Sequence, residues 1–202
     1  MTHRFGARIC GPIVVLVMLV TSARGQGGAA ADTPPAAPTS QVVALTDLEG
    51  AKIHAKLVTD MLAKRQGRQG PATQEGDWQI YLESDGRINF SYRPTTRTPR
   101  GTRTAPVLAR SVKLDEPWPT QNGDAVWQFK DGDLTFVRSY EGGAVRIIIS
   151  LKRDGQNLTC TASSVYAHEQ GKSLVLNSPI DGVPVTILSW KPVSSTCEIT
   201  RQ

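Results

Sequence analysis

The residues most able to do chemistry in this sequence are the arginines of one short stretch. Residues 93–110 read RPTTRTPRGTRTAPVLAR and contain five arginines and no acidic residue. Guanidinium groups bind carboxylate and phosphate through paired hydrogen bonds, so a group of them is typical of an anion-binding surface. We therefore expect a ligand-binding site for an anion such as phosphate, sulfate, uronate or a lipid headgroup. Its residues are Arg93, Arg97, Arg100, Arg103 and Arg110.

The same stretch predicts what kind of segment carries these side chains. Its three prolines exclude a helix and disfavour pairing within a central strand, and its glycine permits a sharp turn. These residues are Pro94, Pro99, Pro106 and Gly101. We expect a long exposed loop between a strand that ends at Arg93 and one that starts near Arg110. The alternative to a binding site is that the arginines keep this loop hydrated or pair with acids of neighbouring loops.

Beyond residue 25, the sequence contains no recognisable catalytic or metal-binding motif. Its two histidines, His54 and His168, are too few for a cluster of three ligands. Ser163 or Ser164 could meet His168 and Asp181 as a nucleophilic triad, but no GxSxG motif accompanies them. We expect no catalytic residue, no metal and no cofactor, and the pattern favours a protein that is not an enzyme.

The chain begins with the pattern of a secretory signal. Two arginines precede an apolar run at 9–20, and small residues follow it. The run is shorter than the about 20 residues that a membrane-spanning helix needs. We expect a signal peptide over 1–25, cleaved after Gly25 or, as the alternative, after Ala31. This predicts a periplasmic or secreted protein without a transmembrane span after cleavage.

The composition divides the remaining chain into a tether and one domain. Residues 26–43 are rich in Ala, Pro and Gly without an apolar period, which predicts a disordered tether. Residues 44–202 are then long enough for one domain with a sizeable core. Removing the three arginines of residues 1–25 leaves 20 basic against 18 acidic residues. Because five of those basic residues lie in 93–110, the rest is slightly acidic, which excludes a broad basic face for nucleic acid.

Two cysteines, Cys160 and Cys197, remain after the signal peptide with its Cys10 is removed. Two cysteines in an oxidising compartment are expected to form a disulfide. Closing a loop of this length contributes about 3–4 kcal/mol in the chain-entropy model. The alternative of a reactive thiol or a metal pair has no CxxC spacing and no nearby histidine in its favour.

Regular turn signals predict the fold. Asp-Gly and Gly-Gly pairs between alternating apolar residues are typical of β-hairpins, because these residues tolerate the positive φ of a tight turn. They occur in SDGR, KDGD, EGGA, RDGQ and IDGV, which start at residues 84, 130, 141, 153 and 180. We expect an all-β fold, a single antiparallel meander barrel of the lipocalin-like kind. A sandwich of two sheets is the alternative.

The alternation between the turns indicates which side chains face the core. Trp78, Ile80 and Leu82 share one face, and the segments at 88–92, 127–136, 145–151 and 158–166 alternate in the same way. Residues 51–64 fit the period of a helix and that of a strand equally well. The preceding Gly50 looks like part of a tight turn, which favours a strand.

Several motifs of this sequence resemble a family of small exported bacterial proteins of unknown function. They are LTDLEG, GDWQI, RTPRGTR, VWQF, DGDLTFVRSY, LTCTASS and VSSTCEI, and they extend over roughly residues 44–200. The resemblance implies an exported β domain and supplies no activity. The opening L-x-G, the meander and the late disulfide are also weakly similar to lipocalins. However, Gly50 is followed by Ala51 and Lys52 where lipocalins have Gly-x-Trp.

These features together predict an exported binding module. The ligand would be an anionic component of the cell envelope, held by the arginine-rich segment or the mouth of the barrel. An anionic glycan, a lipid headgroup or an envelope protein is the expected partner. A protein-interaction or inhibitor domain is the first alternative. An envelope hydrolase that uses an acid near a tyrosine or His168 is less favoured.

Overall fold

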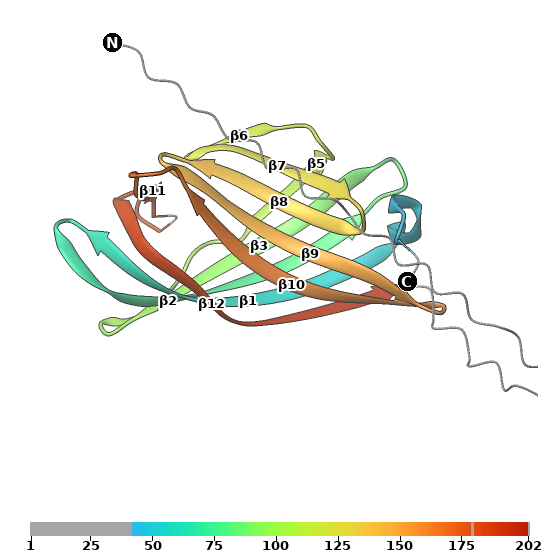
Figure 1. Cartoon of the computed structure of the whole chain (residues 1–202), viewed down its shortest axis with the longest axis horizontal. Coiled ribbons are helices and arrows are strands. Elements are labelled where there is room, and N and C mark those ends of the chain that lie inside the picture. Colours follow the sequence, from blue (N-terminus) through green and yellow to red (C-terminus); the bar gives the residue numbers. More distant parts are fainter. Residues whose placement is uncertain (1–41, 179, 202) are drawn as a thin grey trace, which may run out of the picture. The chain divides into compact units, whose positions relative to one another are not determined.

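The computed structural model describes residues 42–178 and 180–201, which fold into two antiparallel β-sheets (Figure 1). In this part of the chain a short 3-10 helix precedes twelve strands, and no α-helix is present. The elements are η1 (Leu45–Leu48), β1 (Ala51–Arg65), β2 (Arg68–Leu82), β3 (Arg87–Thr98), β4 (Gly101–Thr104), β5 (Leu108–Lys113), β6 (Trp118–Thr120), β7 (Gly123–Lys130), β8 (Asp133–Tyr140), β9 (Gly143–Asp154), β10 (Asn157–His168), β11 (Leu174–Asn177) and β12 (Pro184–Arg201). The predicted all-β fold is confirmed.

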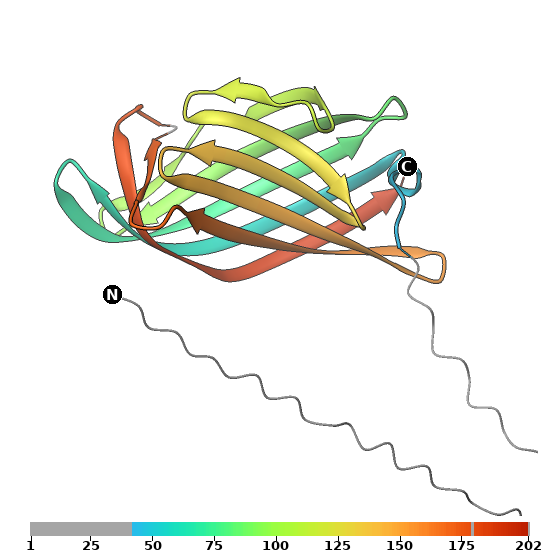
Figure 2. The same ribbon diagram turned by 45° about the horizontal axis from the view of Figure 1, so that its top comes forward.

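The two sheets follow the order of a meander. Sheet A has the order β11-β12-β1-β2-β3-β4, with β5 also paired to β3, and sheet B has the order β10-β9-β8-β7-β6. Sheet A is strongly curled and faces sheet B across a shared core (Figure 2). The fold is therefore the predicted antiparallel one, in which a curled half-barrel and a second sheet form an arrangement between the expected barrel and its alternative, the sandwich. For brevity we call it the barrel.

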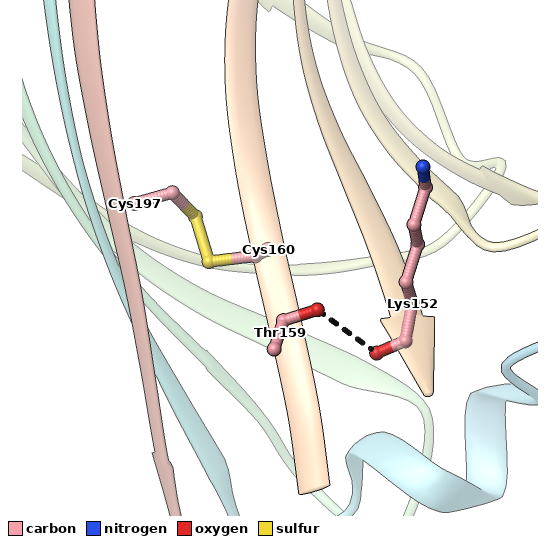
Figure 3. The surroundings of a disulfide bond; sticks show 4 residues. All are labelled: Lys152, Thr159, Cys160 and Cys197. Carbon is pink, nitrogen blue, oxygen red and sulfur yellow. Dashed lines mark hydrogen bonds between the residues drawn. A yellow bond between two sulfur atoms is a disulfide. The ribbon is translucent and has the colours of Figure 1, made fainter. Parts of the chain in front are cut away.

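The ladder of the barrel is interrupted at two seams. No ladder joins β10 to β12 or β5 to β7 within the described residues. Across the first seam Cys160 forms a disulfide with Cys197, with an S–S distance of 2.04 Å and a Cα–Cα distance of 5.6 Å (Figure 3). Across the second seam the Asp115 amide donates a hydrogen bond of 2.8 Å to the carbonyl of Trp127. The predicted disulfide is thus confirmed, and it is compatible with an extracytoplasmic compartment.

Most of the core fills the half of the barrel near η1, and Leu174 and Ile187 extend it toward the other end. Trp78, Ile80 and Leu82 are buried together as their alternation predicts. Trp78 also packs against the rings of Phe136 and Trp127, at centroid distances of 5.1 Å and 6.0 Å. Each large apolar side chain that is fully buried stabilises the fold by about 1.5–3 kcal/mol. This packed half holds both sheets and fixes the direction in which their other ends project.

The segment with two possible periods is a strand. Ala51, Ile53 and Ala55 of β1 are buried while Lys52 and Lys56 between them are exposed. β1 pairs with β12 on one edge and with β2 on the other, so both of its edges are hydrogen-bonded. These two ladders show that residues 51–64 follow the period of a strand and not that of a helix, so the expectation of a strand is confirmed.

The expectation of a long loop at 94–109 is wrong. β3 continues past Arg93 to Thr98, and a tight turn leads back into β4. The carbonyl of Pro94 accepts a hydrogen bond of 2.9 Å from the amide of Ala105, on the side away from β2. In an antiparallel strand the N–H and C=O of one residue point to the same side, so the missing N–H of Pro94 costs no bond to β2. The ladder is interrupted opposite Pro94, between β4 and β5.

The other prolines are placed in the same way at positions without a ladder hydrogen bond. Pro99 lies in the turn between β3 and β4, and Pro106 lies in the unpaired stretch between β4 and β5.

The predicted signal peptide at 1–25 and residues 26–41 of the predicted tether lie outside the described residues. The core begins with Val43, which is 1% exposed.

Candidate functional site

Three connections lie at the end of sheet A that is farther from η1. β1 and β12 pair as Arg65 with Val185, β2 and β3 pair as Thr73 with Arg97, and β11 and β12 pair as Asn177 with Pro184. These registers bring the β1–β2 turn, the β3–β4 turn and the β11–β12 connection to one end. Both hairpins project on the left side of Figure 1, the β1–β2 hairpin beside β11 and the β3–β4 hairpin below it.

Five arginines gather on the two hairpins at this end. The β1–β2 hairpin carries two and the β3–β4 hairpin carries three. We call this group the arginine rim, and its members are Arg65, Arg68, Arg97, Arg100 and Arg103. The side chains of Arg97 and Arg103 are 62% and 65% exposed, so they are open to a ligand. The rim is therefore wider than the predicted segment, because a second hairpin contributes to it.

Two carboxylates neutralise part of the rim. Arg97 pairs with Glu75 of β2 at 3.0 Å. Asp181 of the β11–β12 connection forms an ion pair with Arg65, and its Oδ2 lies 3.9 Å from Nη1 of Arg103. The hydrogen bond from Arg65 is the main cause that lowers the pKa of Asp181. The expected alternative, in which arginines pair with neighbouring acids, is thus realised for some members of the rim.

The other members of the rim have no such partner. Within the described residues Arg68 and Arg100 form no ion pair. Arg68 begins β2 and Arg100 lies in the β3–β4 turn, and both are exposed. An exposed guanidinium without a carboxylate keeps all its donors for water or for an anionic ligand.

The remaining two predicted arginines do not join the rim. Arg93 is on the outer face in the middle of β3, opposite Asp77 of β2. Arg110 is on β5, opposite Phe90 of β3, where it borders a cleft of about 400 Å³ together with Lys113. The structure therefore brings together three of the five predicted site residues. It places Arg93 and Arg110 elsewhere on the same sheet.

Sequence reasoning missed Arg65 and Arg68. The signal that could have found them is the segment KRQGRQG at 64–70, where the alternation of β1 ends in a Gln-Gly pair flanked by cations. Gln66 and Gly67 both have positive φ, as the central residues of a tight hairpin turn do. The strand order of sheet A places this second basic hairpin beside the first. The motif alone does not predict that order.

Both ends of the barrel carry charges of both signs. The turns near η1 carry Asp85 and Asp131 next to the cations Arg87 and Lys130. At the other end, the β8–β9 turn carries Glu141, which is bridged to β11. What distinguishes the arginine rim is that five guanidinium groups gather on two adjacent hairpins, and this local excess of positive charge attracts an anion.

A second depression lies on the outer face of sheet A. This shallow groove has a volume of about 820 Å³ and crosses β12, β1, β2, β3 and β5. On its border Nε2 of His54 lies 2.8 Å from Oδ1 of Asp77. Ser91 and Ser111 contribute small side chains, while Tyr81 contributes a large one. The groove offers hydrogen-bond donors and acceptors of mixed charge, and it is less specific for anions than the rim.

The triad considered from the sequence is not formed. Ser163 and Ser164 are consecutive on β10, so they point to opposite faces. Ser164 is buried and lies 3.4 Å from the hydroxyl of Thr59. Asp181 pairs with Arg65, and the ring of His168 stacks on that of Tyr166.

Nowhere in residues 42–178 and 180–201 do three side chains of His, Cys, Asp or Glu lie together as ligands for a metal ion. In the same ranges there is no helix with the length and apolar character needed to cross a membrane.

Comparison of the chain with protein-family models, with curated proteins and with solved structures finds no match. The resemblance to small exported bacterial proteins and the weaker likeness to lipocalins therefore stay predictions.

Proposed function

We propose that this protein is an exported binding module whose arginine rim holds an anionic component of the cell envelope. The ligand carries several phosphate or carboxylate groups close together, because the guanidinium groups of the rim come from two separate hairpins. Each guanidinium can bind such a group through two parallel hydrogen bonds. The rim is exposed, so the ligand lies against the end of the barrel.

One observation carries this proposal. Five arginines of two adjacent hairpins share one end of sheet A, and only two carboxylates, Glu75 and Asp181, form ion pairs with them in the described part of the chain. A surface that needed arginines only for hydration would not require guanidinium groups in preference to lysine. The planar guanidinium fork is suited to phosphate and carboxylate, where lysine acts only as a point charge.

An acidic glycan and a lipid headgroup can both present several phosphate or carboxylate groups close together. Polygalacturonate represents the glycan, and vesicles of phosphatidylcholine with phosphatidylglycerol represent the lipid. Dextran and vesicles of phosphatidylcholine alone are the neutral controls. Binding to one anionic probe in preference to the other identifies the source.

The test is a triple variant, Arg68→Ser, Arg100→Ser and Arg103→Ser. It removes three cations and leaves the pairs of Arg65 with Asp181 and of Arg97 with Glu75 in place. The matched control is Lys113→Ser, Lys130→Ser and Lys152→Ser, which removes three exposed cations elsewhere on the barrel. Exposed charge pairs contribute about 0.2–1 kcal/mol each, so we expect the rim variant to bind about tenfold more weakly.

The lysine variant separates this account from a general charge effect. Added salt should weaken binding of the wild type and of the lysine variant alike, because exposed charges are screened. Equal loss of affinity in both triple variants, or no binding of wild type to either anionic probe, would remove the proposal. A protein-interaction or inhibitor domain and an envelope hydrolase stay the alternatives, and no specific contact of the described residues favours either.

A further inference from the structure

A second group of polar side chains lies inside the barrel. Gln74 of β2 donates a hydrogen bond of 3.1 Å from Nε2 to the hydroxyl of Tyr92 of β3. On β8, the guanidinium carbon of Arg138 lies 5.3 Å from the centroid of the Tyr140 ring. Nε of Arg138 also donates a hydrogen bond of 3.3 Å to the hydroxyl of Thr120. We call Gln74, Tyr92, Arg138 and Tyr140 the inner-face cluster.

The register of the strands places this cluster on the inner face. Arg138 lies opposite Ala125 of β7 and Val145 of β9, and both of these side chains are buried. Gln74 lies opposite Thr59 of β1, which is also buried. Since residues directly opposite each other in a ladder point to the same face, Arg138 and Gln74 point into the barrel.

Arg138 has no carboxylate to neutralise it. None of the ion pairs among residues 42–178 and 180–201 includes Arg138. The charged and titratable groups that act on Tyr92 are Tyr140 and Arg138, and the one that acts on Tyr140 is Arg138. A guanidinium withdrawn from water without an opposite charge is unfavourable, so such a charge is normally paired. The cluster therefore has a net positive charge on the inside of the barrel.

The surroundings of Arg138 are aromatic and rich in donors. Across β6, β7 and β8, Trp118, Ala125 and Arg138 lie in one row, so only a small side chain separates Arg138 from the indole. The same row continues through Val145 to Tyr166, whose ring stacks with Trp190 at 6.3 Å. The indole N–H groups of Trp118 and Trp190 are buried and meet no acceptor among the described residues. These two unpartnered indole donors and the unpaired guanidinium favour a ligand that supplies acceptors.

The inner face is accessible from the end that carries the arginine rim. In the packed half of sheet A the inner side chains are almost fully buried, such as Ile53 at 1% and Ile80 at 2% exposed. Toward the rim the inner face of β1 and β2 carries Ala63, Gly70 and Ala72, which are only half-buried. On the adjacent strands of the same row, Ile187 of β12 and Leu174 of β11 are buried, so solvent reaches the inner face along the β1–β2 hairpin and not along β11 and β12.

We propose that the inner-face cluster binds the carboxylate of a small aromatic or apolar acid. The guanidinium of Arg138 would hold the carboxylate with its two terminal nitrogens, and the hydroxyls of Tyr92 and Tyr140 would donate to the same oxygens. The apolar part of the ligand would lie against the rings of Trp118, Tyr166 and Trp190. This site takes one charged group inside the barrel, and it is independent of the arginine rim.

The experiment titrates the full chain with benzoate, decanoate and inorganic phosphate, and with benzamide as the neutral analogue. Tryptophan fluorescence reports binding because Trp118 and Trp190 border the cluster, and calorimetry confirms the stoichiometry. We expect benzoate or decanoate to bind with one site per chain and benzamide to bind at least about tenfold more weakly. Binding of phosphate alone, or of none of the probes, overturns the proposal.

Variants locate the site. Arg138→Met keeps the length of the side chain but removes its charge, and it should weaken carboxylate binding by at least about tenfold. Arg146→Met is the control, because Arg146 is exposed on the outer face of the adjacent strand β9. It should bind the probes as the wild type does. Unchanged binding in Arg138→Met, or equal loss in Arg146→Met, contradicts the assignment.

Two further measurements keep the test decisive. If Arg138→Met does not fold, Tyr140→Phe removes one donor with little change in volume and should weaken binding several-fold, while unchanged binding contradicts the proposal. The rim variant Arg68→Ser, Arg100→Ser and Arg103→Ser should bind benzoate or decanoate normally. If the rim binds no anion, carboxylate binding at the inner-face cluster is still expected. If the rim variant loses carboxylate binding, the inner site is not independent of the rim and this proposal is overturned.

Discussion

Single residues decide what this barrel can bind, and the two partly buried phenols of the inner-face cluster are the clearest case. Burial raises the pKa values of Tyr92 and Tyr140 above the ordinary value of 10.0. The charged and titratable groups that act on Tyr92 are Tyr140 and Arg138, and the one that acts on Tyr140 is Arg138. Both side chains therefore stay protonated and can donate hydrogen bonds over the whole physiological range of pH.

These shifted tyrosines predict how stability depends on alkaline pH. The unfolded chain loses phenolic protons near pH 10 while the folded chain retains them, so the free energy of unfolding falls as the pH rises above 10. Each tyrosine lowers it by about 1.4 kcal/mol per pH unit until its folded pKa is reached. Urea unfolding of wild type and Tyr140→Phe at pH 9 and pH 11 measures this. An equally steep fall in the variant would contradict the assignment to Tyr140.

At the residue scale, part of the site could be predicted and part could not. The alternation of LTFVRSY places Arg138 on the face of Leu134 and Phe136, so the sequence contains the signal for an inward arginine. Because a charged residue of a strand normally faces solvent, this alternation alone does not single out Arg138 as a residue of a binding site. That Tyr92 and Arg138 lie near each other depends on how two sheets face each other, which local alternation does not encode.

At the scale of elements, the β11–β12 connection is fastened to both hairpins of the rim. Asp181 of this connection forms an ion pair with Arg65 and lies near Arg103. Asn122 of the β6–β7 turn accepts a hydrogen bond of 2.6 Å from the amide of Asn177. The connection thereby links the edge of sheet A to a turn of sheet B and reduces the positive charge of the rim.

Replacing this carboxylate predicts a gain in ligand binding. Asp181→Asn leaves Arg65 and Arg103 without a negative partner, so affinity for polygalacturonate or anionic vesicles should rise about two- to fivefold at low salt. Because Arg65 lowers the pKa of Asp181, the stabilising contribution of the pair is complete above pH 3.8. It is lost as the pH falls further through the folded pKa. A lower affinity in Asp181→Asn would contradict a role of Asp181 as a competitor for the rim.

The arginine-rich segment shows why elements are predicted unevenly. Proline count and lack of alternation suggest a loop at 94–109, but Pro94 lies in β3 with its missing N–H on the side where the ladder is interrupted. Whether a proline disrupts a strand depends on which neighbour its N–H would face, and that neighbour is set by tertiary pairing. Tertiary pairing also decides the structure of residues 51–64. Their ladders with β12 and β2 make them the strand β1, which the turn at Gly50 favoured.

At the scale of the whole molecule, one covalent bond spans the seam between the sheets at β10 and β12. Cys160 and Cys197 are 37 residues apart, and no ladder joins their strands in the described part of the chain. Cys160→Ser with Cys197→Ser should lower the free energy of unfolding by about 3–4 kcal/mol. Urea unfolding of the double variant measures the loss. A change below about 1 kcal/mol would mean that packing alone holds the sheets together.

The proposed function depends on the arginine rim as the surface that selects an anionic ligand. The most direct measurement follows the arginine Nε–H resonances of isotope-labelled protein during titration with polygalacturonate and with vesicles that contain phosphatidylglycerol. We predict shifts that saturate at Arg68, Arg97, Arg100 and Arg103 and leave Arg87 and Arg146 unchanged. Equal shifts at all arginines, or shifts confined to residues outside the rim, would contradict the account.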